Sequence, residues 1–252
     1  MPNMYMLIGN VGCGKSFLAS KLAQLGNAVV SMDALYPMFN GGHSADYDSA
    51  KKPIYHATED AAIESALASG LSVVIDRTNI NRKTRQRFMD LGHKYAAQVV
   101  AYNWGPGTEA DLQRRCRETR NSSLKTWAKV FKSMQEAYEA PTPEEGFAEI
   151  IEPPRRFKFH AFDFDGTLVE NRSPGIGDII SGTADKMNAL FEDLSNVIII
   201  WTCRAGDLEA EMRDFLHRQK IRYDFINENP IWDPGSRKVF AHFYYDDRNT
   251  VV

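Results

Sequence analysis

The fold of the first half of this chain is decided by one stretch: Gly9, Asn10, Val11, Gly12, Cys13, Gly14, Lys15 and Ser16. The stretch fits the pattern G-x-x-x-x-G-K-[ST], and it lies between an apolar run that predicts a strand and a segment that predicts a helix. Its glycines let successive backbone N–H groups turn inward around phosphate oxygens, and the start of the helix adds favourable partial charge. It therefore predicts a phosphate-binding loop, and a chance glycine-rich turn is the weaker alternative.

Two side chains of this loop have predicted roles toward a nucleotide. Lys15 is expected to reach the β- and γ-phosphates of ATP, and the Ser16 hydroxyl is expected to ligate Mg²⁺. ATP and Mg²⁺ are therefore the predicted cofactors. The loop alone does not separate a kinase from an ATPase or a GTPase.

Two aspartates follow later strands of the same half. Asp33 comes just after a strand predicted over 28–31, so in a parallel sheet it emerges at the edge that holds the loop. A carboxylate there can accept the proton of a substrate hydroxyl that attacks the γ-phosphate, and a helix N-cap is the alternative. Asp76 ends the next predicted strand. It is expected to hold Mg²⁺ or its water shell, or to order Ser16.

The run RRCRETR, residues 114–120, contains four arginines. Guanidinium groups pair well with the equatorial oxygens of a transferring phosphoryl group, and small phosphotransferases close an arginine-bearing lid over that group. We predict Arg117 and Arg120 as the functional pair, with one or two of the others at the surface.

The composition is that of a folded protein in a reducing compartment. The chain has 252 residues, 43% hydrophobic and 25% charged, which leaves room for two domains. No apolar run approaches the ~20 residues that span a bilayer, and the first residues lack the pattern of a secretory signal. The three cysteines have neither paired nor metal-ligand spacing. We expect a cytoplasmic protein without a membrane partner.

The net charge of −3 hides an asymmetry, because residues 77–132 hold 13 Lys or Arg against 4 Asp or Glu. A basic segment inside an acidic chain suggests an anionic ligand on one surface, either nucleotide phosphates or a nucleic-acid backbone. The alternative is a set of solvated helix faces, and charge alone does not decide between the two.

Both halves alternate predicted strands and helices, which is typical of parallel α/β sheets. In the first half the strands cover 4–8, 28–31, 71–75 and 97–102, and the helices cover 15–25, 53–69, 82–93, 108–119 and 124–138. In the second half the strands cover 157–164, 197–201 and 240–245, and the helices cover 183–193 and 206–219. The proline-containing stretch 141–156 predicts a linker between domains 1–140 and 157–252. The predicted fold class is α/β, with two domains, each a mostly parallel sheet flanked by helices.

Two aspartates flank one residue where the first strand of the second half ends, in the sequence DFDGTL. Asp163 and Asp165, at i and i+2, share one face of an extended strand, and the turn at Gly166 lets both converge on a cation. In such a site one aspartate attacks phosphorus covalently while its neighbour protonates the leaving oxygen. Two aspartates that merely cap a loop are the alternative.

Later residues supply the remaining chemistry. Thr202 ends another predicted strand with Arg204 nearby, and both offer donors to phosphoryl oxygens. Lys238 can neutralise charge, and the pair Asp246 and Asp247 suits Mg²⁺. The intervals between these motifs leave no room for a sizeable lid domain. An uncovered site suits the end of a polymer better than a small metabolite.

These motifs make the second half resemble the haloacid dehalogenase-like phosphohydrolases, in the small capless form. The resemblance implies that Asp163 is the nucleophile and Asp165 the general acid. It also implies that Thr202 and Lys238 bind phosphate. The implied metal-binding residues of this half are Asp163, Asp165, Asp246 and Asp247.

The first half resembles the polynucleotide 5′-kinase domains of phage end-healing enzymes. The loop, the position of Asp33, the segment TNIN at 78–81, the arginine-rich run and FKSM at 131–134 carry this resemblance. Kinase first and phosphatase second is the order in the phage-type 5′-kinase/3′-phosphatases. One departure is Tyr36, which stands where that family usually has an arginine that contacts the acceptor strand.

The resemblance implies a bifunctional enzyme. It would phosphorylate 5′-hydroxyl ends of RNA or DNA and remove 3′-terminal phosphates through an aspartyl-phosphate. A separate ligase is a candidate partner, and homo-oligomerisation is open. Two alternatives are a small-molecule kinase fused to a nucleotidase and a nucleotide-binding module with an inactive phosphatase fold.

Overall fold

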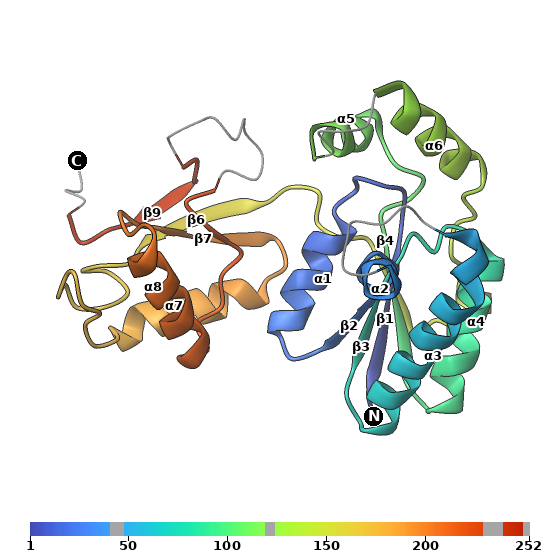
Figure 1. The fold of residues 1–252 in the computed structure, drawn as a ribbon, viewed down its shortest axis with the longest axis horizontal. Coiled ribbons are helices and arrows are strands. Elements are labelled where there is room, and N and C mark those ends of the chain that lie inside the picture. Colours follow the sequence, from blue (N-terminus) through green and yellow to red (C-terminus); the bar gives the residue numbers. More distant parts are fainter. Residues whose placement is uncertain (41–47, 119–123, 229–238, 249–252) are drawn as a thin grey trace. The chain divides into compact units, whose positions relative to one another are not determined.

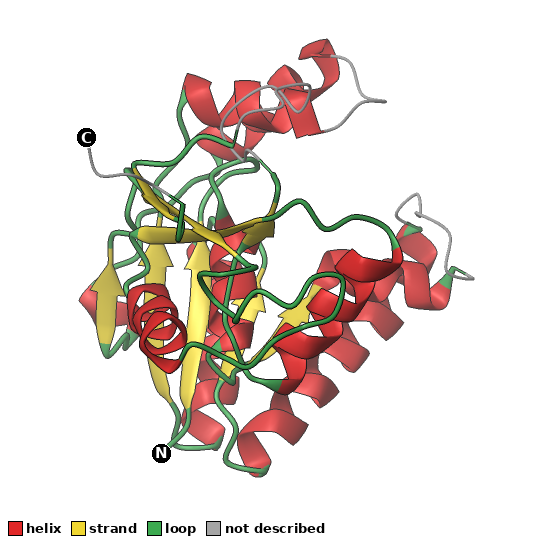
Figure 2. Cartoon of the chain, turned by 90° about the vertical axis from the view of Figure 1, so that its left-hand side faces the viewer, coloured by secondary structure: helices red, strands yellow, loops and turns green. Residues whose placement is uncertain are grey.

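A computed structural model describes residues 1–40, 48–118, 124–228 and 239–248, and the chain divides into two compact units, Met1–Pro153 and Pro154–Val252. Each unit is built around its own parallel sheet (Figures 1 and 2).

The first unit holds a five-stranded sheet in the order β2-β3-β1-β4-β5, and all of its pairings are parallel. Its strands are β1 (Asn3–Ile8), β2 (Ala28–Ser31), β3 (Val73–Asp76), β4 (Gln98–Asn103) and β5 (Glu149–Ile151). The central strand β1 reads as a nearly continuous apolar run because a parallel sheet is buried on both faces. Its Met4, Met6 and Ile8 belong to the core with Phe88 and Met89.

The helices of this unit are α1 (Lys15–Gln24), α2 (Met32–Phe39), α3 (Lys52–Ala68), α4 (Arg82–Lys94), α5 (Glu109–Glu118) and α6 (Leu124–Glu136). Two short 3₁₀ turns are η1 (Ser49–Lys51) and η2 (Pro143–Glu145). Figure 1 shows α1 on one side of the sheet, α3 and α4 on the other, and α5 and α6 beyond the carboxyl ends of the strands. Ligands of open parallel sheets bind at that edge.

The second unit holds a four-stranded parallel sheet in the order β8-β7-β6-β9. Its strands are β6 (Lys158–Asp163), β7 (Asn196–Trp201), β8 (Phe225–Ile226) and β9 (Phe243–Tyr245). Its helices are α7 (Ser181–Glu192) and α8 (Asp207–Arg218). The β6–β7 pair forms the core of the sheet, since Ala161, Phe162, Ile199 and Ile200 have no exposed surface.

Among the described elements, no residue range was predicted for α2, β5, β8 and the two 3₁₀ turns. Both strands are very short, and each exists through its pairing with a longer parallel neighbour. Strand β5 lies inside the stretch 141–156 that was expected to be a linker, and it adds a fifth strand to the first sheet beside β4. The ordered part of the first unit therefore extends further than residue 140, and the two units meet at Pro153 and Pro154.

A buried ion pair fastens this extension to α4. The Arg85 guanidinium donates to both carboxylate oxygens of Glu145, at 2.8 and 2.7 Å, and also to the carbonyl oxygen of Glu139 at 2.8 Å. Burial alone would raise the pKa of Glu145, but the hydrogen bonds from Arg85 and the Thr142 N–H outweigh it, and this pKa is lowered.

We therefore expect Arg85→Met to lower the free energy of unfolding by about 3–5 kcal/mol, because it leaves the Glu145 charge buried and unpaired. Urea unfolding curves measure the effect. The double variant Arg85→Met/Glu145→Met should recover much of the loss, since it removes both charges. A loss below about 1 kcal/mol in the single variant would contradict a structural role for the pair.

Candidate active sites

The loop between β1 and α1 depends on glycine at two positions. Gly12 and Gly14 have φ angles of 74° and 100°, in the left-handed region. A Cβ at Gly12 would lie 2.2 Å from the carbonyl oxygen of Asp111, so no side chain fits there. Gly14 is the N-cap of α1, and no side chain caps the first turn of that helix. The backbone N–H groups at this helix start are the groups that hold phosphate oxygens in loops of this kind.

Three of the predicted side chains meet beside the loop. The Lys15 side chain is buried, and its Nζ donates to the carbonyl oxygen of Asn10 at 2.6 Å. The Ser16 hydroxyl hydrogen-bonds with the Asp76 side chain. Burial raises the pKa of Asp76, and the nearby charge of Asp33 adds to the rise, while Ser16 and Lys15 oppose it. A hydroxyl and a carboxylate next to a phosphate loop form a donor set that fits Mg²⁺ held with a nucleotide.

Asp33 lies at the same edge of the sheet. It is the second residue of α2, whose N-cap position is taken by Ser31, so the alternative of an N-cap aspartate does not hold. Ser31 is paired in register with Asp76 of the neighbouring strand β3, which explains why the two carboxylates influence each other. The Asp33 side chain is exposed.

The Asn10 side chain fastens the loop to the segment that carries α6. Its Nδ2 donates to the carbonyl oxygens of Pro106 and Phe131, at 2.9 and 3.0 Å. The Val11 N–H donates to Asn10 Oδ1 at 2.8 Å. Asn10, which was predicted to bind the cofactor as part of the loop 9–16, thus uses its side chain inside the protein.

The structure places Arg114 against the loop, which is neither of the two arginines that we predicted for the transferring phosphoryl group. Arg114 Nη1 donates to the Gly12 carbonyl oxygen at 3.0 Å, so Arg114 touches the loop. Arg117 lies one turn further along α5, is exposed, and donates to the carbonyl oxygen of Gln113 in its own helix at 3.4 Å. Arg120 lies outside the described residues.

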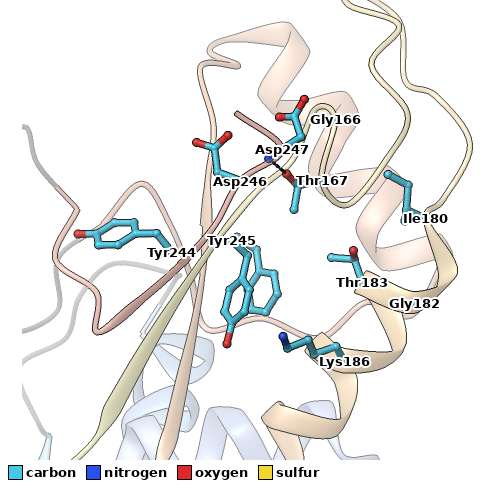
Figure 3. Close-up of a pocket in the computed structure, with 11 residues that line it drawn as sticks. Gly166, Thr167, Ile180, Gly182, Thr183, Lys186, Tyr244, Tyr245, Asp246 and Asp247 are labelled. Atoms are coloured by element: carbon cyan, nitrogen blue, oxygen red, sulfur yellow. Dashed lines mark hydrogen bonds between the residues drawn. The ribbon is translucent and has the colours of Figure 1, made fainter. Parts of the chain in front are cut away.

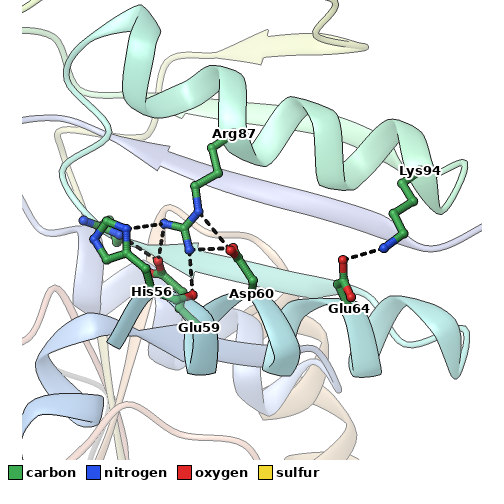
Figure 4. Close-up of polar contacts among 7 residues, drawn as sticks. His56, Glu59, Asp60, Glu64, Arg87 and Lys94 are labelled. Atoms are coloured by element: carbon green, nitrogen blue, oxygen red, sulfur yellow. Dashed lines mark hydrogen bonds and ion pairs between the residues drawn. The ribbon is translucent and has the colours of Figure 1, made fainter. Parts of the chain in front are cut away.

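Part of the basic segment 77–132 neutralises acidic residues of the fold. Arg77 and Arg87 both pair with the buried Glu59, at 2.7 and 2.9 Å. Figure 4 shows Arg87 between Glu59, Asp60 and His56, and Lys94 paired with Glu64 at 2.7 Å. These ion pairs join α4 and the residue after β3 to α3. Their cations therefore neutralise carboxylates of the fold and are not the cations that an anionic ligand would meet.

The second unit brings three carboxylates together. Asp163 ends β6, and Asp246 and Asp247 directly follow its parallel neighbour β9, so the three side chains share one edge of the sheet. Their ligand oxygens lie within 4.8 Å of one another. A Cβ at Gly166 would lie 2.6 Å from the Asp247 carboxylate, which explains the glycine. This compact set of hard oxygen donors fits a divalent cation such as Mg²⁺.

Burial and repulsion within this cluster raise the pKa of Asp163. Burial and the charges of Asp246, Asp247 and Asp165 raise the pKa of Asp163 to about 6, although the Phe164 N–H hydrogen bond opposes the rise. Below about pH 6 the carboxyl carries a proton that a cation must displace, and above it the carboxylate is free to bind.

We therefore expect the affinity of the intact chain for Mg²⁺ to fall by about tenfold for each pH unit below about 6, and to level off above that pH. Metal titration in the absence of nucleotide measures this dependence. Asp163→Asn should flatten the curve as it weakens binding. An affinity that does not change with pH between about 5 and about 7 would contradict the assignment.

Asp165 does not join the cluster. Arg204 Nε and Nη2 donate to its two oxygens, at 2.8 and 2.6 Å, and Arg204 is buried and also donates to the carbonyl oxygen of Gly175 at 2.7 Å. We predicted that Asp165 would converge on a cation with Asp163, because the two share a strand face and the chain turns at Gly166. Strand β6 ends at Asp163, so the shared strand face stops before Asp165, and the turn directs its carboxylate to Arg204.

Thr202 follows β7, whose last residue Trp201 is paired in register with Asp163. The Thr202 Oγ1 accepts from the Arg204 N–H at 3.1 Å. Asn227, which sequence reasoning missed, accepts from the Thr202 N–H and donates to its carbonyl oxygen, at 2.9 and 2.8 Å. Thr202 is thus placed at the same edge as the nucleophile candidate. Lys238 lies outside the described residues.

The open parallel sheet and the phosphate loop define the first unit as a P-loop domain of the nucleotide-binding kind. A family model described as an AAA domain matches residues 4–141, and the chain belongs to this family. The fold and the family support the binding of a nucleotide by this unit. Among the described helices, none combines the length and the apolar character needed to cross a membrane.

Several solved structures are also similar to the chain. A chain of the Pnkp1/Rnl/Hen1 RNA repair complex matches at 18% identity and a TM-score of 0.44, over 89% of this chain and 78% of that one. A conserved protein from Bacteroides thetaiotaomicron matches at 30% identity and a TM-score of 0.34, over 37% of this chain and 78% of its own. A gluconokinase from Sinorhizobium meliloti 1021 matches at 21% identity and a TM-score of 0.39, over 61% of this chain and 85% of its own.

Proposed function

We propose that this chain is a bifunctional enzyme that acts on nucleic-acid ends. The first unit transfers the γ-phosphoryl group of ATP to a 5′-hydroxyl, and the second removes a 3′-terminal phosphate. The proposal is carried by one observation: each unit holds its own set of phosphoryl-transfer groups at the carboxyl edge of its own sheet. A 5′-phosphate and a 3′-hydroxyl are the ends that a ligase joins.

In the first unit the roles follow from placement. Asp33 accepts the proton of the attacking hydroxyl, because it is exposed at the start of α2 beside the loop. Lys15 moves its ammonium from the Asn10 carbonyl oxygen to the phosphates, and Arg114 lies against the loop at Gly12. When bound, ATP·Mg²⁺ supplies the phosphoryl group and neutralises its charge. Ser16 and Asp76 are the residues that would hold the metal.

In the second unit Asp163 attacks the phosphorus of the 3′-phosphate and forms an aspartyl-phosphate, which water hydrolyses. Asp165 protonates the leaving 3′-oxygen, and this step requires that one of its oxygens turn from Arg204 toward the substrate. Thr202 donates to a phosphoryl oxygen. Asp246 and Asp247 would hold Mg²⁺ with Asp163, and the metal would screen the repulsion between nucleophile and phosphate.

A second candidate function is a small-molecule kinase fused to a nucleotidase. The ion pairs of Arg77, Arg85, Arg87 and Lys94 favour it, because these cations serve the fold and not a polyanion. Tyr36 favours it too, since it leaves no cation at the position where the phage-type kinases contact their acceptor strand.

The deciding experiment offers γ-labelled ATP together with an oligonucleotide that bears 5′-hydroxyl and 3′-phosphate ends. RNA, DNA and a free nucleoside are tested in parallel. We expect label at the 5′ end and release of phosphate from the 3′ end. Transfer to the nucleoside but not to either oligonucleotide would support the second candidate. The absence of both activities would leave a nucleotide-binding module without catalysis.

A further inference from the structure

A pocket of about 480 Å³ opens beside the three-carboxylate cluster of the second unit. Figure 3 shows Asp246 and Asp247 at one end of it and Lys186 of α7 at the other, with Thr183 beside Lys186. Between the two ends Tyr245 lines the pocket, while the ring of the neighbouring Tyr244 points away from Lys186. The pocket therefore has an acidic end that suits a metal-bound phosphate and a basic end that the phosphatase chemistry does not use.

The basic end is held in place by a column of packed groups. The Lys186 ammonium lies 4.3 Å from the centroid of the Tyr245 ring, a cation–π distance. The same ring stacks on Phe162 with centroids 4.1 Å apart, and the Tyr245 hydroxyl hydrogen-bonds with His160 Nδ1 at 3.2 Å. The ring under Lys186 is thus fixed from two sides.

Lys186 has no counterion among the described residues. Its side chain is exposed on α7, and the ring of Tyr245 is the partner that the structure provides. A free ammonium at the mouth of a pocket attracts an anion, while Asp246 and Asp247 repel any anion at their end that a metal does not neutralise. The pocket is therefore electrostatically suited to a molecule with two separate phosphates.

We propose that Lys186 binds a second phosphate of the phosphatase substrate, the one on the 5′ side of the nucleoside whose 3′-phosphate is removed. This inference rests on the proposed phosphatase function. The nucleoside between the two phosphates spans the pocket from the acidic end to Lys186. A 3′-phosphorylated oligonucleotide and a nucleoside 3′,5′-bisphosphate share this chemistry, whereas a nucleoside 3′-monophosphate lacks it.

The test compares these three substrates in the intact wild-type chain and in Lys186→Gln. The quantity measured is the ratio of kcat/KM for each two-phosphate substrate to kcat/KM for the monophosphate. We expect Lys186→Gln to lower this ratio by about tenfold, the usual worth of a charge-assisted contact with phosphate. Lys186→Arg should keep most of the wild-type ratio. Lys158→Gln is the matched control, because Lys158 is exposed at the opposite end of β6 from Asp163.

A binding measurement complements the kinetics. Calorimetry without added metal should show that the bisphosphate binds more tightly than the monophosphate, and that Lys186→Gln removes the difference. A reduced ratio for the bisphosphate alone would identify a free nucleotide as the source of the second phosphate. A reduced ratio for both two-phosphate substrates would show that the second phosphate can also belong to the end of a strand.

Failure of the proposed phosphatase function and failure of the role of Lys186 give different results. A wild-type chain that hydrolyses none of the three substrates overturns the proposed phosphatase function. A wild-type chain that is active, with ratios and binding unchanged in Lys186→Gln, overturns the role of Lys186 alone. An equal loss on all three substrates also overturns it, because that pattern means Lys186 only supports the fold through Tyr245.

Discussion

Asp163→Asn should reduce 3′-phosphate removal by roughly 10⁴-fold or more and leave 5′-phosphorylation intact. An amide has little nucleophilicity toward phosphorus, so no aspartyl-phosphate forms. Burial and the charges of the neighbouring aspartates raise the pKa of Asp163 to about 6, and a neutral amide relieves both costs, so we expect the second unit to stay folded. The measurement follows both ends of an oligonucleotide that carries a 5′-hydroxyl and a 3′-phosphate.

Lys15→Ala is the reciprocal variant. It removes the ammonium that now contacts the Asn10 carbonyl oxygen and that we expect at the β- and γ-phosphates. Phosphorylation of the 5′ end should stop while 3′-phosphate removal continues. Either variant could lose both activities while keeping the unfolding temperature of the wild type. In that case the two sites would not be independent, and one composite site would become the better account.

Asp33→Asn should lower 5′-phosphorylation by roughly 10²–10⁴-fold with little change in ATP affinity. The reason is that Asp33 stands on α2, outside the loop 9–16, so its loss removes the base but not the phosphate cradle. Single-turnover phosphorylation and a separate measurement of the Kd for ATP separate the two effects.

The matched control for Asp33 is Asp90→Asn, an exposed carboxylate on α4 that interacts only with Gln86 of its own helix among the described residues. It should leave both measurements unchanged. Turnover that is equally unchanged in Asp33→Asn would rule out a base at this position. A thermal unfolding curve of each variant shows whether a loss of activity comes from a loss of fold.

The parts of the fold that could be predicted are those whose pattern is local. The strand expected over 28–31 is observed as β2 with the same bounds, and α1 and β1 differ from expectation by one residue at one end. Their apolar runs and glycine boundaries are contained in a few consecutive residues. Strands β5 and β8 could not be predicted in this way, since three and two residues carry no periodicity of their own.

The candidate sites divide in the same way. Glycine, lysine and serine at 9–16 are neighbours in the chain, so their spacing alone predicts a phosphate loop. The cluster of Asp163, Asp246 and Asp247 was predicted from a resemblance, and the structure brings its oxygens within 4.8 Å. The Asp165 carboxylate lies apart from this cluster for a physical reason: β6 ends at Asp163, and the turn that follows directs the carboxylate to Arg204.

The sequence by itself determined the alternation of strands and helices, the loop 9–16 and the residue types available for chemistry, because these depend on local periodicity and on side-chain identity. Only the tertiary structure decided that Arg114 rather than Arg117 meets the loop, that Arg204 holds Asp165, and that Lys186 faces the acidic cluster across a pocket. Each of these contacts joins segments that are far apart in the chain. Their distances depend on how whole helices pack on a sheet, and no short window of sequence contains that information.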